Sequence, residues 1–574
     1  MFSVTFNRVR LTWPDGTPCL DDVTLAFSPG VTGVVGDNGS GKSTLLKLIT
    51  GEIAPTAGTV VVGGSVGVLP QNLTLRTDDT VADLLGIRAQ VDAVRAIVGG
   101  DPDPAHFDAV GEDWDIEARA AEELGAVGLD LGLDRPVGTL SGGEAMLVAL
   151  VGLSVRRLDV VLLDEPTNNL DRNTRVRVYS LLERWRGTAV VVSHDVELLR
   201  RVGSIVEVRD GEVEAFGGNW EVYREAVGIS QEAAGRALRA AEQQLRTEKR
   251  QKVEAEKRLA RRENAGKPAA ARGVSKAARD FYANRSEKAI GKARGEFDDK
   301  IAAARSAVDD AEARLRDDER VRIDLPDPGV GTGRRLAEIV DAAGVIHVIQ
   351  GPERVALVGP NGVGKTLLIE LMVASADTLG HDPSRRATPL RGWAPSGSER
   401  RATPLRGWAP SGSGAAGSIT ARVGYLPQRL DHLDDARAVL DCIRDAAPTV
   451  EPGAIRNRLA RFGLRGDAAL RPLGTLSGGE RFRASLAALL LAEPPAQLLI
   501  LDEPSNNLDL ATVEVLVDAL RQYRGGLLVV SHDDDFLARL AVGRRLELHH
   551  DGSISDVVEP VDRADGGKSG VYHQ

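Results

Sequence analysis

The sequence predicts an α/β protein with two homologous domains, each built on a mostly parallel core sheet, joined by a long helical linker. A glycine-rich loop occurs twice, as GDNGSGKST from Gly36 to Thr44 and as GPNGVGKT from Gly359 to Thr366. An apolar, β-branched run precedes each loop and a helix-like segment follows it. Two further apolar runs, one ending in Asp-Glu and one in Ser-His, recur in both halves as buried parallel strands would.

The repeat extends beyond the glycine loops. The segments LSGGE, LDEP and SHD each occur once in each half, in the same order. Glu165 precedes His194 by 29 residues, and Glu503 precedes His532 by 29 residues. A large repeat of this kind sets the architecture before any single element is assigned. We therefore predict a first domain at residues 1–225, a linker at 226–322, a second domain at 323–562 and a tail at 563–574.

Composition limits the class of protein. The 574-residue chain has only two cysteines, Cys19 and Cys442. We interpret these as ordinary buried thiols rather than a disulfide framework or a metal cluster, in keeping with a reducing compartment. No stretch approaches the roughly 20 apolar residues of a membrane span, and the first residues lack a signal-peptide run. We expect a soluble, cytoplasmic protein.

The segment between the two copies favours helix. It is rich in Ala, Glu, Lys, Arg and Gln. Gly266, Pro268 and Gly273 interrupt the pattern near its middle, which predicts two antiparallel helices of roughly 35 to 40 residues, about 50 to 60 Å long. Residues 246–294 carry 16 Lys and Arg against 6 Asp and Glu, in a chain with a net charge of −11. A basic arm on an acidic body suits a polyanionic partner, although a charged helix can also be only a solvated surface.

A second irregularity lies in the later half, at about residues 380–418. The segment RRATPLRGWAPSGS at Arg385 recurs at Arg400. Its Pro, Gly and Ser content predicts a disordered surface insertion. Tandem duplication of coding sequence explains the repeat better than a function does.

The glycine loops predict phosphate binding. Successive backbone N–H groups of such a loop point at phosphate oxygens, and the following helix N-terminus adds positive potential. The lysine should bind the β- and γ-phosphates, and the next hydroxyl should bind Mg²⁺. The residues concerned are Gly36, Asn38, Gly39, Gly41, Lys42, Ser43 and Thr44 in the first loop, and Gly359, Asn361, Gly362, Gly364, Lys365 and Thr366 in the second.

Polar side chains that follow the apolar runs predict hydrolysis. The Asp of each Asp-Glu pair should hold Mg²⁺ through water, and the Glu should polarise the attacking water, an effect worth roughly 10² to 10⁴ in rate. A histidine after the next run can reach the γ-phosphate, whereas an isolated histidine is more often structural. A glutamine in each LPQ segment can sense Mg²⁺ and the water. These residues are Asp164, Glu165, His194 and Gln71 in the first half, and Asp502, Glu503, His532 and Gln428 in the second.

Together, the glycine loop, the LPQ glutamine, LSGGE, LDEP and SHD resemble the ATP-binding cassette (ABC) superfamily. The resemblance covers both domains and implies P-loop NTPase cassettes with a helical subdomain, ATP and Mg²⁺ as cofactors, and hydrolysis of ATP to ADP and phosphate. It further implies that LSGGE of each domain caps nucleotide bound by the other, so that a monomer sandwiches two ATP molecules. The capping residues would be Ser141, Gly142, Gly143, Ser477, Gly478 and Gly479.

Trp13 stands where the ABC superfamily keeps an aromatic that stacks on adenine, which would contribute about 1 kcal/mol or more. The alternative is a core tryptophan. No aromatic occupies the corresponding stretch before Gly359. The two nucleotide sites are therefore not expected to be identical.

Two fused cassettes, the sequences EPTNNLD and EPSNNLD, and a charged linker are similar to the ABC-F subfamily of ribosome-associated ATPases. That subfamily usually has His where Asn169 and Asn507 stand. The resemblance implies binding to rRNA of the large ribosomal subunit, and to tRNA, with the linker acting near the tRNA exit site and the peptidyl-transferase centre. Phe281 and Tyr282 could stack on a base there or pin the two linker helices together.

Several functions share these motifs. The long linker favours ribosomal protection against an antibiotic over a translation factor of the same subfamily. A motor subunit of an ABC drug exporter with separate membrane subunits would carry the same ATPase motifs but does not predict the basic linker. DNA-repair and chromosome-organising ATPases would require zinc-binding cysteines or much longer coiled coils.

Overall fold

The structure is a computed structural model that describes residues 4–69, 78–266, 295–312, 325–379, 415–420, 422–428, 430, 433–506 and 508–558, with only the backbone for 259–266, 377–379, 415 and 558. The chain forms two compact units. One consists of Met1–Trp220 and Arg320–Gln574, and the other of Glu221–Glu319. The first unit therefore contains both halves of the repeat, and we call these halves the first and second cassettes.

The first cassette is built on a six-stranded sheet and a smaller three-stranded sheet. Its strands are β1 (Val4–Thr12), β2 (Pro18–Phe27), β3 (Gly30–Val35), β4 (Ala57–Val62), β5 (Val66–Leu69), β6 (Val160–Asp164), β7 (Thr188–Val192), β8 (Ser204–Arg209) and β9 (Glu212–Gly217). The large sheet has the order β5-β6-β7-β3-β8-β9, and only its β8–β9 pair is antiparallel. The small sheet, β2-β1-β4, is antiparallel.

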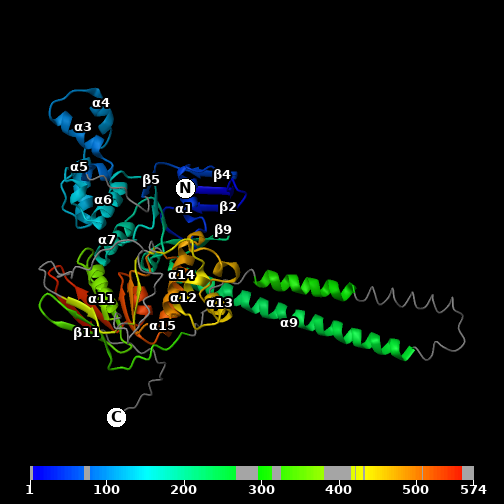
Figure 1. Ribbon diagram of the computed structural model, residues 1–574. Coiled ribbons are helices and arrows are strands. Elements are labelled where there is room, and N and C mark those ends of the chain that lie inside the picture. The colour runs from blue at the N-terminus through cyan, green and yellow to red at the C-terminus, as the bar shows by residue number, and fades with distance from the viewer. Residues whose placement is uncertain are drawn as a thin grey trace, which may run out of the picture. The chain divides into compact units, whose positions relative to one another are not determined.

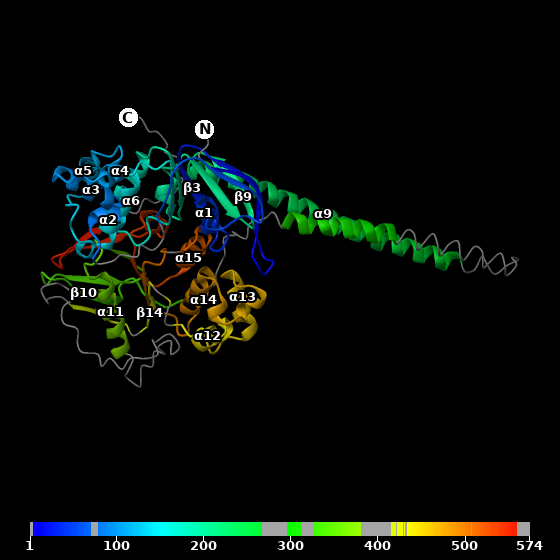
Figure 2. The same ribbon diagram turned by 90° about the horizontal axis from the view of Figure 1, so that it is seen from above.

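The helices of the first cassette cover the large sheet and form a separate cluster. They are α1 (Lys42–Thr50), α2 (Val81–Leu85), α3 (Arg88–Val98), α4 (Pro104–Val110), α5 (Ile116–Ala126), α6 (Gly142–Val155), α7 (Arg172–Glu183) and α8 (Val196–Leu199). Figures 1 and 2 both show α3 to α6 gathered together, apart from the strands β2 and β9. This is the helical subdomain that the resemblance implies.

The strand β6 shows why the sheet has helices on both faces. Alternate side chains of a strand point to opposite faces. Val161 and Leu163 pack in one buried cluster with residues of α6, whereas Val160 and Leu162 pack in another with Leu45 of α1. Because both faces are buried, the strand is apolar at every position before Asp164, as the sequence predicted.

The second cassette repeats this architecture. Its strands are β10 (Arg335–Val340), β11 (Ile346–Gln350), β12 (Arg354–Val358), β13 (Ala415–Ser418), β14 (Val423–Leu426), β15 (Leu498–Asp502), β16 (Gly526–Val530), β17 (Arg544–Leu548) and β18 (Ile554–Val558), and its helices are α11 (Lys365–Leu379), α12 (Val439–Ala446), α13 (Pro452–Arg461), α14 (Gly478–Leu490), α15 (Leu510–Gln522) and α16 (Asp534–Arg539). The large sheet has the order β14-β15-β16-β12-β17-β18, with only β17 and β18 antiparallel. The predicted α/β class is confirmed.

The predicted insertion at 380–418 needs a correction at its end. Residues 415–418 form β13, which pairs antiparallel with β10 in the small sheet β11-β10-β13. Ser418 is buried and its Oγ donates a hydrogen bond to the Met372 carbonyl, 2.9 Å away. The small residues AAGS lack the β-branched pattern by which a strand is recognised, so the sequence did not reveal it. Both copies of the duplicated segment lie outside the described residues.

The second unit contains two paired helices. Helix α9 runs over 47 residues, Trp220–Gly266, longer than the predicted 35 to 40, and residues 295–312 form another helix. The two lie side by side (Figures 1 and 2), and Lys252 Nζ is 2.6 Å from Asp298 Oδ1. Pro268, Gly273, Phe281 and Tyr282 lie outside the described residues. Among the described helices, none combines the length and apolar character that crossing a membrane demands.

Candidate functional site

The first predicted phosphate loop connects β3 to α1. Gly36 has a φ of 148°, and a Cβ there would lie 2.2 Å from the Val208 carbonyl oxygen, so no larger residue fits. Lys42 folds back over the loop, and its Nζ donates hydrogen bonds to the carbonyls of Gly36 at 2.7 Å and Asp37 at 2.9 Å. The side chain is thereby held across the N-terminus of α1, where an anion is stabilised.

The second loop, between β12 and α11, has the same geometry. Gly359 has a φ of 141°, and a Cβ there would lie 2.3 Å from the Leu548 carbonyl oxygen. Lys365 Nζ donates to the carbonyls of Gly359 at 2.7 Å and Pro360 at 2.8 Å. It also lies 3.2 Å from His532 Nε2. The two predicted phosphate loops thus have the same backbone geometry and the same position of the lysine side chain.

A hydroxyl and a carboxylate meet beside each loop. Ser43 Oγ donates to Asp164 Oδ2 at 3.0 Å, and Thr366 Oγ1 donates to Asp502 Oδ2 at 3.0 Å. Oxygen ligands of this kind suit Mg²⁺, which keeps several waters and shares substrate phosphates rather than filling an all-protein cage. Among the described residues, no three His, Cys, Asp or Glu side chains are grouped to hold a metal ion. The pairs therefore fit Mg²⁺ bound together with a nucleotide.

The two predicted general bases are buried in strained backbone. Glu165 and Glu503 have φ values of 52° and 47°, in the left-handed region that costs a non-glycine residue about 1 to 3 kcal/mol. Each is less than a tenth exposed. His194 Nε2 is 3.4 Å from Glu165 Oε1, and His532 Nε2 is 3.4 Å from Glu503 Oε1. Each glutamate also has one buried oxygen without a hydrogen-bond partner in the described part of the chain.

Burial favours the protonated, neutral form of these glutamates. It raises the pKa of Glu165 to about 8, against the opposing effect of Lys42. Burial likewise raises the pKa of Glu503 to about 7, against the charges of Arg175 and Lys365. A carboxylate with a pKa near the working pH is suited to accepting a proton.

The two histidines are held neutral. Burial and then the neighbouring lysine lower the pKa of His194 and of His532, the latter to about 3. A neutral imidazole can donate one hydrogen bond and accept another. Each histidine can therefore contact both a phosphate oxygen and the glutamate beside it.

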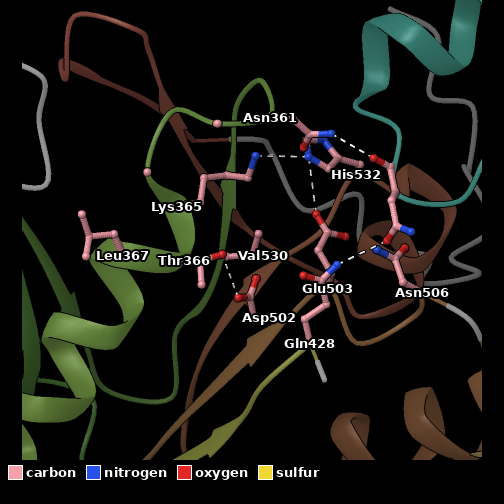
Figure 3. A pocket seen from close by; sticks show the side chains of 13 residues that line it. Asn361, Lys365, Thr366, Leu367, Gln428, Asp502, Glu503, Asn506, Val530 and His532 are labelled. Atoms are coloured by element: carbon pink, nitrogen blue, oxygen red, sulfur yellow. Dashed lines mark hydrogen bonds and ion pairs between the residues drawn. The ribbon is translucent and has the colours of Figure 1, made fainter. Parts of the chain in front are cut away.

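The second site opens into a cavity of about 360 Å³. Figure 3 shows Lys365, Thr366, Asp502, Glu503 and His532 converging there. The cavity is lined by Asn169, Asn361, Gly362, Gly364, Lys365, Thr366, Leu367, Gln428, Asp502, Glu503, Asn506, Val530 and His532. One of these residues comes from the first cassette.

That residue, Asn169, contacts two predicted site residues. Asn361 Nδ2 donates to its carbonyl at 3.0 Å, and Gln428 Nε2 donates to its side-chain Oδ1 at 3.3 Å. A φ of 59°, which asparagine tolerates better than most residues, directs it toward the second site. Across the first loop, the Asn38 N–H donates to Asp509 Oδ2 of the second cassette at 2.8 Å. The NNLD segments thus touch the opposite glycine loops, a contact that the sequence analysis missed although the segment occurs twice.

Both LSGGE segments begin a helix. Ser141 caps α6 and Ser477 caps α14, and each forms a reciprocal capping box with the glutamate three residues later. Gly142, Gly143, Gly478 and Gly479 form the first turns of these helices. None of these LSGGE residues lines the 360 Å³ cavity at the second site. That LSGGE caps the opposite nucleotide stays a prediction.

Trp13 lies in a turn after β1 and is 38% exposed, which excludes a core tryptophan.

Gly39, Gly41, Gly362 and Gly364 all have positive φ within their loops, between 81° and 106°. Gln71 and Asn507 lie outside the described residues. Thr44 belongs to the first turn of α1.

A known protein family matches this chain twice, once in each cassette. The family described as ABC transporter matches residues 20–168 and 347–506. The tylosin resistance ATP-binding protein TlrC of Streptomyces fradiae is 31% identical, with 94% of this chain and 96% of that protein covered. The energy-dependent translational throttle protein EttA of Mycobacterium tuberculosis is 30% identical, with 94% and 90% covered. The ATP-binding protein Uup of Escherichia coli is 29% identical, with 94% and 79% covered.

Proposed function

We propose that this chain, which belongs to the ABC-F subfamily of ATP-binding cassette ATPases and hydrolyses ATP, binds the large ribosomal subunit and protects it from an antibiotic. The observation that carries the proposal is the likeness to a tylosin resistance ATP-binding protein over 94% of this chain. A match of that extent includes the linker as well as both cassettes. In this proposal the linker acts near the tRNA exit site and the peptidyl-transferase centre.

Each ATP would be bound by one glycine loop and by residues of the opposite cassette. Lys42 and Lys365 would bind the phosphates, Trp13 would stack on one adenine, and the LSGGE segments would cap the opposite nucleotide. Bound Mg²⁺ would neutralise developing charge on the phosphates. The residues that would hold it are Ser43, Gln71, Asp164, Thr366, Gln428 and Asp502.

The attacking water would lose its proton to the buried glutamate of each site, while the adjacent histidine contacts the γ-phosphate. ATP bound between the cassettes would favour their closed arrangement, and hydrolysis of that ATP would allow the cassettes to open again, as a population shift requires. The NNLD contacts support this coupling because they join each cassette to the opposite glycine loop.

Cations on α9 support binding to RNA. Arg246, Lys249, Arg250, Lys257 and Arg258 are exposed along the helix. Lys and Arg on a helix gain affinity by releasing counterions from phosphates, and structured RNA is recognised largely by shape and backbone. Arg261 and Arg262 belong to the same basic segment, but their side chains lie outside the described residues.

Sedimentation with ribosomes tests the proposal. In a chain with Glu165→Gln and Glu503→Gln, ATP should be retained and the complex with ribosomes should accumulate. Adding Lys257→Glu and Arg258→Glu should remove most of the co-sedimenting protein, because these exposed cations lie in the basic segment. Arg236→Glu with Arg239→Glu is the matched control on the same helix, outside that segment, and should bind normally. If both pairs of substitutions abolish ribosome binding, or if neither does, the basic segment of α9 is not the part of the chain that binds the ribosome.

Inhibitory concentrations distinguish protection from translation control. Expression of the chain should raise the inhibitory concentration of tylosin or of another ribosome-targeting antibiotic, and the double Gln variant should not. The likeness to a translational throttle protein supports the second candidate, a translation factor. Ribosome binding without any change in inhibitory concentration would favour that candidate. Recovery with a membrane protein instead of ribosomes would favour an exporter motor.

A further inference from the structure

Two arginines of the first cassette form ion pairs with the first turn of α16 in the second cassette. Arg172 Nε lies 2.9 Å from Asp534 Oδ2. Arg200 Nη2 lies 3.1 Å from Asp535 Oδ1. Arg172 is the first residue of α7 and Asp534 is the first residue of α16, so their contact joins the starts of two helices from different cassettes.

Asp534 is also held by its own cassette. Arg545 of β17 donates from Nη1 to Asp534 Oδ1 at 2.9 Å, while the other oxygen of the carboxylate faces Arg172. The Arg545 side chain is 19% exposed, compared with 67% for Arg172. An isolated exposed pair contributes little, in part because two long side chains must be immobilised, whereas a network of charges contributes more. Because Arg545 fixes Asp534, only Arg172 has to be ordered when the pair between the cassettes forms.

Arg172 occupies a position that is unfavourable for its own helix. The N-terminus of a helix carries a partial positive charge, so a cation in the first turn is repelled and an anion is stabilised. The same effect favours Asp534 in the first turn of α16. The charge of Arg172 is therefore better explained by its partner in the second cassette than by the stability of α7.

The repeat places other residues at the equivalent positions. NNLDRNTR aligns with NNLDLATV, and SHDVELLR aligns with SHDDDFLA. The counterparts of Arg172, Arg200, Asp534 and Asp535 are, in that order, Leu510, Ala538, Val196 and Glu197. A leucine, an alanine, a valine and a glutamate cannot form an ion pair with one another. The chain can therefore build these pairs between the cassettes only at the α16 side.

The third charge of the network is likewise confined to one side. Arg545 pairs with Ala356 of β12, and Ile205 pairs with Gly33 of β3. Ala356 and Gly33 each lie three residues before their glycine loop, so Ile205 is the counterpart of Arg545. Three charged residues at the α16 side thus correspond to three apolar residues at the other.

The pair between Arg172 and Asp534 lies beside the second site. Both residues line a cavity of about 240 Å³ together with Gly359 and His532. Asp534 follows His532 by two residues, and Arg172 follows Asn169 by three. Asn169 and His532 line the 360 Å³ cavity from different cassettes. The ion pair therefore restrains Asn169 relative to His532.

We propose that Arg172 and Asp534 are positioning residues for ATP at the second site, where their ion pair holds Asn169 of the first cassette against the cavity. The inference rests on the ATPase activity and takes the 360 Å³ cavity as the second ATP site, as proposed above. It does not depend on ribosome binding or on antibiotic protection. The first site has Leu510 and Val196 at these positions and is not held in this way.

The test is a double-mutant cycle on hydrolysis at the second site. In a chain with Glu165→Gln, which disables the first site, KM and kcat for ATP are measured with Arg172→Leu, with Asp534→Val and with both. These substitutions copy the residues at the equivalent positions of the repeat. Each single substitution should raise KM about threefold, the size expected for a partly exposed ion pair. The change in kcat should be smaller, because the reacting groups of the second cassette stay in place.

The combined variant separates a direct interaction from two independent effects. Its KM should be no higher than that of Asp534→Val alone, since one ion pair can be lost only once. Arg172→Lys keeps the charge and should restore most of the affinity. Arg184→Leu removes an exposed arginine at the other end of α7 and is the matched control, which should leave KM unchanged.

A comparison of the two sites completes the experiment. In a chain with Glu503→Gln, which reports on the first site, Arg172→Leu should change KM by less than about twofold. An unchanged KM at the second site, additive losses in the combined variant, or equal changes at both sites would overturn the proposal. The chain with both Gln substitutions provides the blank. A blank as fast as Glu165→Gln alone would contradict the proposed second site itself, and the inference with it.

Discussion

The two ATP sites should respond differently to pH, because their buried glutamates differ in pKa. Glu503→Gln leaves the first site with an intact base, and Glu165→Gln leaves the second. A general base works as the carboxylate, so activity at each site should rise with pH through the pKa of its glutamate. In a plot of hydrolysis rate against pH, the rising limb should therefore be centred near pH 8 for the first site and near pH 7 for the second.

The structure sets the size of the difference. At pH 7, about half of Glu503 is ionised but only about a tenth of Glu165, so the fraction of active base differs about fivefold. At pH 9 both are largely ionised and the difference disappears. The same nucleotide and Mg²⁺ would bind at both sites, so their charges should move both limbs in the same direction and preserve the separation.

The assay is phosphate release from each single Gln variant between pH 5.5 and 9.5, with unfolding temperatures measured across the range. Each variant also serves as the control for the other, since the two differ only in which site is disabled. Coincident limbs, or a more acidic limb at the first site, would refute the reasoning that burial and local charge set these values. The double variant should lose both limbs.

Two predictions concern stability and loop geometry. Gly36→Ala should weaken ATP binding more than Gly39→Ala: a Cβ at Gly36 meets the Val208 carbonyl at 2.2 Å, whereas a Cβ at Gly39, which also has positive φ, meets nothing within 4 Å. Titration with a fluorescent ATP analogue measures this, and equal losses would mean that backbone strain alone decides. Arg354→Leu should lower the free energy of unfolding by about 2 to 3 kcal/mol, because its guanidinium donates to four carbonyls at the C-terminal ends of α15 and α16. Denaturant unfolding checks this against Arg524→Leu, an exposed control expected to change stability by less than about 0.5 kcal/mol.

Much of the fold was predictable because the signals are local. A glycine loop between a β-branched run and a helix specifies its own conformation, as the φ of 148° at Gly36 illustrates. Runs of apolar residues such as AVVV predict strands buried on both faces, and β7 is buried at every position. The end of the insertion was missed because AAGS becomes a strand only through its pairing with β10.

The candidate site was predicted one cassette at a time. The sequence showed that Lys365, Thr366 and Glu503 belong to one catalytic set, since each follows a recognisable strand. It did not show that Asn169 lines the same cavity, because no local pattern reports a contact between residues 192 positions apart. Nor did it show that Arg175 is buried, since an arginine near the start of a helix is ordinarily exposed.

The sequence by itself determined the α/β class, the two cassettes and the ATPase chemistry, because these depend on short motifs and on hydrophobic periodicity. Only the tertiary structure decided which residues of one cassette reach the site of the other, and how far burial raises the pKa of each glutamate. Both depend on distances through space and on exclusion of water. Those quantities arise only when segments far apart in the chain pack together.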